Sequence, residues 1–217
     1  MKITVNLDKP KTIKKSLEII GGLTQTEKMP GFSYSLPAQE CKTGSKLRKI
    51  KNSVCSTCYA LKGNYVRYPK ISESQYRRLN KLNNPLWVYS MVFILKHSKK
   101  IQDLKLFRWH DSGDIQSLDH FKKIIKVCES TPEIKHWLPT KESKIIKNYK
   151  GEIPKNLVIR LSGSMIDGSK PNYKNTSTVT TNIKNVTCGA SLVKNGKCGN
   201  CRKCWDSNIK NVCYYNH

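Results

Sequence analysis

The stretch LKLFRWHDSGDIQSLDHFKKIIKVCESTPEIKHWLP, residues 104–139, decides the fold class. Its first run, 104–110, is rich in apolar and aromatic residues and predicts a strand that ends at the turn 111–114. Apolar residues then recur at helical spacing over 117–129, and the run 134–139 predicts a second strand. A strand, a helix and a strand in this order indicate two parallel strands joined by a right-handed crossover.

The same alternation continues on both sides of this unit. We expect further strands over 31–36, 157–161 and 176–181, and helices over 72–81, 85–99 and 141–149. These units predict an α/β protein, a partial TIM-like (β/α) barrel of about six parallel strands. We divide the chain into an N-terminal extension over 1–30, the barrel over 31–182, and an irregular cysteine-rich segment over 183–217 that packs on the barrel.

Seven of the nine cysteines fall into two groups, which are Cys41, Cys55 and Cys58 near the first strand and Cys188, Cys198, Cys201 and Cys204 near the C-terminus. Two residues between thiols let neighbouring sulfurs converge on one metal centre. The C-x2-C-x2-C run of the second group is the spacing that ferredoxins use for a [4Fe–4S] cluster. We therefore expect all seven to be metal ligands, with [4Fe–4S] as the cofactor and zinc as the alternative.

The barrel model makes a further prediction about the two groups. A barrel that opens near residue 31 and closes near residue 181 would bring both groups to one rim, so we expect a single shared cluster, with the surplus thiols free or holding a second metal. Cys128 lies on the apolar side of its predicted helix and is expected in the core. Cys213 is expected to be a free thiol near a frayed C-terminus.

The sequence shows no N-terminal apolar segment of the signal-peptide kind, and its longest apolar stretch, 86–95, is too short to cross a bilayer. We therefore expect no membrane association and a reducing compartment. Clustered thiols in such a compartment indicate metal ligands rather than disulfides.

The net charge is +25, from 40 basic and 15 acidic side chains. Such a surface attracts polyanions, and nucleic acid is the abundant one. The sequence carries no RNA-recognition motif, helix-turn-helix or C2H2 finger, so we expect nucleic-acid binding without sequence preference. The alternative is a solvated lysine-rich surface that has no specific partner.

Polar residues follow the predicted strands, where parallel α/β folds build their sites. They are Arg108, His110, Asp111, Asp114, Thr140, Lys141, Arg160, Ser162 and Ser164. A structural histidine at His110 and a helix cap at Asp114 or Ser117 are the alternatives to a functional role.

The order of motifs resembles the phage "gene product 88" family over about residues 30–206. It is carried by Leu36-Pro37-Ala38, Cys41, Cys55-x2-Cys58-Tyr59-Ala60, Ser112-Gly113-Asp114, Pro139-Thr140-Lys141, Thr187-Cys188-Gly-Ala190 and Gly196-Lys-Cys198-Gly-x-Cys201-Arg-x-Cys204-Trp205. The element 55–60 also resembles the cluster loop of radical S-adenosylmethionine enzymes, which use a partial TIM-like barrel. Two departures stand out: thirteen residues separate Cys41 from Cys55, and Ser112-Gly113-Asp114 is only a distant counterpart of the Gly-Gly-Glu-type motif.

The resemblance implies a phage-encoded iron–sulfur protein with a redox or binding role, a possible redox partner, and a place in the cytoplasm of the infected host cell. One alternative is a genuine radical S-adenosylmethionine enzyme that acts on nucleic acid or peptide. The other is a zinc-stabilised module that binds nucleic acid.

Overall fold

The computed structural model describes residues 8–193 and 196–216 as a mixed α/β fold around one seven-stranded sheet. The strands follow the sheet in chain order: β1 (Thr24–Gln25), β2 (Phe32–Tyr34), β3 (Leu106–Trp109), β4 (Lys135–Thr140), β5 (Leu157–Ile166), β6 (Thr176–Thr180) and β7 (Asn211–Tyr215). Strand β1 is antiparallel to β2, and each later neighbour pair is parallel. The prediction of about six parallel strands is confirmed. The sheet is open, with β1 and β7 at its two edges, so a closed barrel is not formed.

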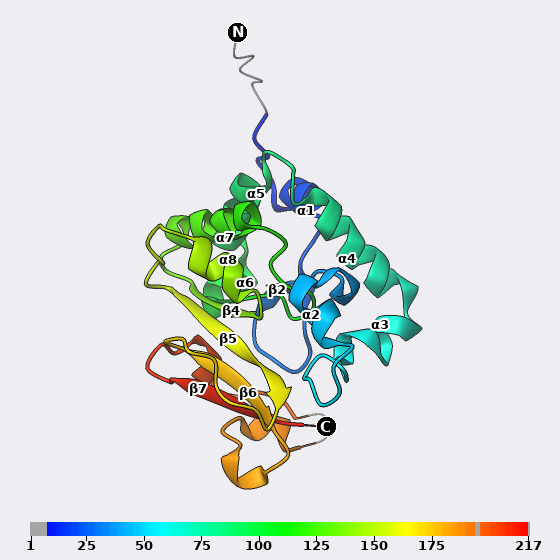
Figure 1. The fold of residues 1–217 in the computed structure, drawn as a ribbon. Coiled ribbons are helices and arrows are strands. Elements are labelled where there is room, and N and C mark those ends of the chain that lie inside the picture. The colour runs from blue at the N-terminus through cyan, green and yellow to red at the C-terminus, as the bar shows by residue number, and fades with distance from the viewer. Residues whose placement is uncertain (1–7, 194–195, 217) are drawn as a thin grey trace.

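The helices gather mainly on one side of the strands (Figure 1). They are α1 (Ile13–Ile20), α2 (Lys42–Leu47), α3 (Asn64–Arg67), α4 (Pro69–Lys81), α5 (Trp87–His97), α6 (Lys99–Leu104), α7 (Leu118–Ser130) and α8 (Ser143–Asn148). Short 3-10 turns are η1 (Ala38–Glu40), η2 (Tyr59–Leu61), η3 (Ile183–Asn185), η4 (Gly189–Ser191) and η5 (Lys203–Trp205). Helix α7 begins where predicted, because Ser117 caps it by accepting a hydrogen bond from the backbone N–H of His120.

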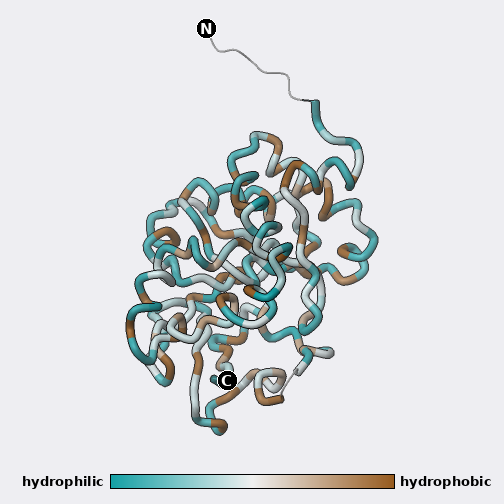
Figure 2. Tube along the Cα trace, turned by 90° about the vertical axis from the view of Figure 1, so that its right-hand side faces the viewer, coloured by the Kyte–Doolittle hydropathy of each residue, from teal (hydrophilic) through white to brown (hydrophobic). Residues whose placement is uncertain are grey.

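The larger core lies between the sheet and these helices. Alternation along β3 places Phe107 and Trp109 in it, and Cys128 joins them from α7, as predicted. A second, smaller cluster lies on the opposite face, where Leu106 and Trp137 pack against Trp205 of the C-terminal segment. Hydrophilic residues are spread around the outline of the molecule (Figure 2), in keeping with the strongly basic composition.

Three segments differ from the sequence prediction. Strand β5 continues through Ser162–Ser164, where the register with β6 shifts, because a glycine in a strand allows a bulge as well as a turn. The C-terminal segment is not wholly irregular, since β7 pairs with β6 in register and buries Cys213. The first 30 residues contribute α1 and β1, and Ile20 of α1 belongs to the main core.

Candidate functional site

The first three thiols lie in the loop that follows the carboxyl end of β2. Gly44 of α2 brings two of them together: a Cβ atom added there would lie 3.7 Å from Cys41 Sγ and 3.6 Å from Cys55 Sγ. Burial is the main cause that raises the pKa of the Cys41 thiol, and the neighbouring Asp114, Cys58 and Cys55 raise it further. We call Cys41, Cys55 and Cys58 the N-terminal thiol group.

Asp114 is held against this group by the turn after β3. Gly113 has φ 78°, and a Cβ there would meet the Leu36 carbonyl at 2.7 Å, so this close approach requires glycine. The Asp114 carboxylate accepts hydrogen bonds from Thr140 Oγ1 at 2.6 Å and from the backbone N–H of Lys141 at 2.8 Å. Burial raises the pKa of Asp114 to about 6, against these hydrogen bonds.

The end of β4 supplies two further groups beside the thiols. Lys141 donates from Nζ to the Gly163 carbonyl, and burial lowers its pKa while the nearby Cys55 and Asp114 oppose that shift. Glu142, which was not among the predicted site residues, accepts two hydrogen bonds from Thr43 of α2. The sequence gives one signal for Glu142, its place directly after a predicted strand end.

The last four cysteines form a second set, the C-terminal thiol group. Cys188, Cys198, Cys201 and Cys204 line a single cavity of about 30 Å³ together with Trp205 and Val212. Burial raises the pKa of Cys204 to about 11, although its hydrogen bond with Tyr214, 3.3 Å from Sγ to Oη, lowers it. Burial also raises the pKa of Cys198, with Cys188 and Cys201 adding to the effect.

Arg160 organises the chain around this second group. Its side chain is fully buried and donates to five backbone carbonyls, four of them in the C-terminal segment. The acceptors are Thr176, Lys203, Cys204, Asp206 and Ile209. Arg160 therefore points away from the N-terminal thiols and serves the fold of the segment that carries the other four.

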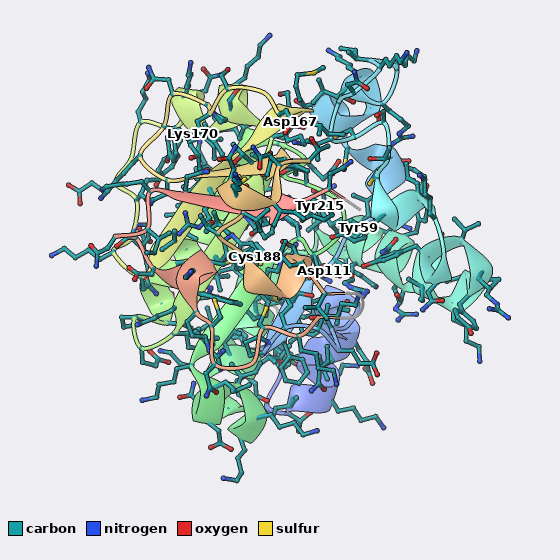
Figure 3. The ribbon with its side chains drawn as sticks, turned by 90° about the horizontal axis from the view of Figure 1, so that it is seen from below. Tyr59, Asp111, Asp167, Lys170, Cys188 and Tyr215 are labelled. Carbon is teal, nitrogen blue, oxygen red and sulfur yellow. The ribbon has the colours of Figure 1, made fainter. Side chains whose placement is uncertain are left out.

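A polar cluster lies between the two groups. Tyr59, next to Cys58, donates to the Asp111 carbonyl, and Figure 3 labels both residues near the centre of this view from below. The Arg108 guanidinium lies 4.5 Å from the centre of the Trp137 ring. Burial lowers the pKa of Arg108, but the nearby ionisable groups Tyr59, Asp111, Tyr214 and Cys204 outweigh it, so that the pKa is raised.

The remaining strand-end residues have structural contacts. His110, in the left-handed region at φ 55°, has its Nδ1 3.1 Å from the Tyr34 carbonyl, and burial lowers its pKa to about 4. Ser162 contacts Ser177 of β6, and the Ser164 carbonyl accepts from Val54 in the cysteine loop. These contacts hold the cysteine loop against β5.

The single shared centre stays a prediction, and the structure describes the two thiol groups with separate neighbours. Within residues 8–193 and 196–216, the cavity of the C-terminal group is lined by none of the first three cysteines. The sulfurs are neighbours without converging: in that same part of the chain, no set of three or more Cys, His, Asp or Glu side chains is arranged to hold a metal ion. A metal at either group would therefore have to draw its thiols inward.

The comparisons bear on family alone. Across the described residues, no helix combines the length and the apolar character that a membrane crossing needs. Searches of curated proteins and of solved structures give no match. A protein-family model, gene product 88, matches residues 4–207, nearly the whole chain. The chain therefore belongs to the gene product 88 family, a phage-type family.

Proposed function

We propose that this protein is a phage iron–sulfur protein that holds a [4Fe–4S] cluster at Cys41, Cys55 and Cys58. The observation that carries the proposal is the gathering of Cys41 and Cys55 around Gly44, at the carboxyl edge of a parallel sheet, with Cys58 close enough to raise the pKa of Cys41. In parallel α/β folds that edge is where sites are built. Three soft sulfur donors in one loop suit iron–sulfur chemistry better than they suit a hard cation.

The three thiols can serve as ligands of an iron–sulfur cluster once they have lost their protons. Burial raises the pKa values of the Cys41 and Cys55 thiols, so without a metal both are protonated at neutral pH. Metal binding would displace these protons and order the loop. The Lys141 ammonium lies close enough to oppose the raised pKa of Cys55, and it would offset part of the negative charge of the thiolates. Glu142 and Asp114 fix the positions of α2 and of the β4 end.

We infer a separate metal at the C-terminal thiol group. Four thiols line one cavity of about 30 Å³, which has room for about two water molecules. Four thiols around one space can supply the complete tetrahedral ligand set of a single zinc ion. In this role the metal would order the chain between β6 and β7, where Arg160 already gathers the carbonyls.

A second candidate function is a radical S-adenosylmethionine enzyme. It is supported by the number of thiols, because a cluster held by three cysteines has one iron open to another ligand. It is supported also by the six parallel strands in chain order, which resemble part of a barrel. Both candidates would act in the cytoplasm of the infected host cell, in keeping with a phage-type family.

The visible spectrum of anaerobically purified variants tests the assignment. We expect Cys58→Ser to lose the cluster absorption band, and Cys201→Ser to keep the band while losing the second metal. Cys213→Ala, a buried thiol outside both groups, is the matched control and should keep both. A band that survives Cys58→Ser would exclude a cluster at the N-terminal group. Loss of one band in both serine variants would indicate a shared cluster instead.

The two candidate functions differ in their response to S-adenosylmethionine. If the open iron takes this ligand, the electron paramagnetic resonance signal of the reduced cluster changes when it is added. An unchanged signal would support the redox or binding role. The same experiment with Cys41→Ser should show no cluster signal at all.

A further inference from the structure

The segment around the N-terminal thiol group is basic and free of acidic residues. Between Cys41 and Ser72, a run of 32 residues, the chain has no Asp or Glu. Its eight basic residues are Lys42, Lys46, Arg48, Lys49, Lys51, Lys62, Arg67 and Lys70. We call residues 42–70 the basic wing. It comprises α2, η2, α3 and the start of α4, which lie together on one side of the sheet (Figure 1).

The charges of the wing are available to a partner. All of its basic side chains except Arg48 are exposed, and Arg48 is partly so. The ion pairs of the described residues join Lys15 to Glu18, Lys99 to Asp103 and Lys123 to Asp119, and none involves the wing. The basic wing is therefore a surface of uncompensated positive charge, which favours a polyanionic ligand.

The wing also exposes rings. Tyr59 and Tyr68 keep 58% and 49% of their surfaces in contact with solvent. The Arg67 guanidinium lies 5.8 Å from the centre of the Tyr68 ring, and the Tyr59 and Tyr65 rings meet edge to face at 5.8 Å. Exposed tyrosines among lysines and arginines are the combination on which unpaired bases stack while phosphates contact the cations.

Residues 168–205 form another acid-free run and provide an internal contrast. Residues 168–205 contain exposed basic residues such as Lys170, Lys174 and Lys184, but their exposed large apolar residues are aliphatic: Ile183, Leu192 and Val193. That segment offers charge without exposed rings. The run 74–102 is also acid-free, and its one exposed large ring, Tyr89, keeps 36% of its surface in contact with solvent. The basic wing exposes two rings, both to a larger extent, among its cations.

We propose that the basic wing binds single-stranded nucleic acid, with phosphates on its lysines and bases stacked on Tyr68 and Tyr59. A duplex keeps its bases stacked on each other and would use the charges alone. Binding of this kind has no sequence preference, because every base has a face that can stack. It places the bound strand beside Cys58, the residue that precedes Tyr59.

Fluorescence anisotropy with labelled oligo-dT, oligo-rU and a mixed-sequence duplex of equal length tests the proposal over a range of salt concentrations. The charge variant is Lys46→Gln/Lys49→Gln/Lys51→Gln, and its matched control is Lys170→Gln/Lys174→Gln/Lys184→Gln. We expect the wing variant to reduce the slope of log K against log salt by about 2, since each phosphate contact on a single strand contributes about 0.7. The control should leave the slope unchanged.

The stacking variant is Tyr68→Ala, and Tyr89→Ala on α5 is its control, because Tyr89 is also partly exposed. We expect Tyr68→Ala to weaken single-strand binding about tenfold or more, with little effect on the duplex. Comparison of oligo-dT with oligo-rU identifies the natural strand as DNA or RNA. The iron content of each variant, measured in parallel, separates a lost surface from a lost cluster.

Three results would overturn the proposal. The first is undetectable binding of either single strand at low salt. The second is an equal loss of salt dependence in the two triple variants, which would assign binding to general charge. The third is tight duplex binding together with full retention of single-strand affinity in Tyr68→Ala.

Discussion

Glu142 accepts hydrogen bonds from Thr43 at both oxygens of its carboxylate, 2.8 Å from the backbone nitrogen and 2.9 Å from Oγ1. The pair joins residues 99 positions apart in the chain, one on α2 between the cysteines and one at the carboxyl end of β4. Since Glu142 is buried, the two bonds are shielded from water and fix the cysteine loop on the sheet.

Glu142→Ala should therefore affect both folding and metal binding. It leaves the Thr43 donors without a partner, and we expect about 2 kcal/mol of lost stability together with reduced iron content. Glu142→Gln keeps one accepting oxygen and should lose less of both. Urea unfolding and iron analysis of the two variants measure this, and equal iron content in wild type and Glu142→Ala would refute a role for the pair in shaping the site.

Gly44→Ala tests the approach of the thiols around α2. The new methyl group would lie 2.9 Å from Cys41 Cβ, so the cysteine has to move, at a cost of about 1–3 kcal/mol. We expect the visible cluster band to weaken strongly. Gly189→Ala is the control, because a Cβ there meets no atom within 4 Å. Similar bands in both alanine variants would show that the contact does not shape the cluster site.

Arg160→Lys should loosen the segment that carries the C-terminal thiols. The Arg160 guanidinium donates hydrogen bonds to five carbonyls from three nitrogens, whereas lysine has a single charged nitrogen. Several buried carbonyls would therefore lose their donors. We expect a loss of about 3 kcal/mol or more and rapid proteolysis between β6 and β7. Arg77→Lys, which removes a guanidinium with a single bond to Gly21, should cost far less. Unchanged proteolysis in Arg160→Lys would contradict the assigned role.

Buried histidines should make the free energy of unfolding fall as the pH is lowered. His136 packs against Phe107 and Trp109, and burial lowers its pKa from 6.5 to about 3. Below pH 6.5 His136 becomes protonated in the unfolded chain but stays neutral in the folded chain. The free energy of unfolding therefore falls as the pH falls towards 3. His110 and His120 act in the same direction, since burial lowers their pKa values too. Asp114 acts oppositely between its ordinary pKa near 3.8 and about 6, because the folded state there binds the extra proton.

His136→Gln should make this dependence less steep. One titrating group fewer lowers the slope of unfolding free energy near pH 5 by about 1.4 kcal/mol per pH unit. Glutamine can still bond Thr131, whose Oγ1 lies 2.9 Å from His136 Nε2. Urea titrations at several pH values measure the slope. An identical slope in wild type and variant would show that His136 already titrates normally in the folded protein.

The sequence predicted the elements whose signals are local. The strands near 106–109 and 135–140 and the helix 118–130 follow from periodicity and a serine cap. Strand β7 was missed because NVCYY is short and lies beyond a cysteine cluster, and the length of β5 was missed because Ser162-Gly163-Ser164 has the composition of a turn. The extent of both strands is set by their pairing with β6. That pairing is a tertiary contact, and the local sequence pattern does not reveal it.

The site residues also divide into those with a local sequence signal and those set by tertiary contacts. Spacing identified both cysteine groups, and strand ends identified Asp114 and Lys141. The contribution of Gly44 depends on its close approach to Cys41 and Cys55, which no local pattern marks. The contribution of Glu142 depends on its contact with Thr43 far away in the chain, and its place after a predicted strand end was the one local signal. The shared centre predicted from barrel closure stays a prediction: the sheet is open, but the C-terminal segment reaches back towards β2, where the backbone N–H of Cys198 donates to the Lys28 carbonyl.

Metal and sulfide analysis of the full chain purified without oxygen tests the central claim most directly. We expect about four irons and four sulfides per chain, with one zinc ion at the C-terminal thiols. A colourless protein that holds zinc but neither iron nor sulfide would contradict it.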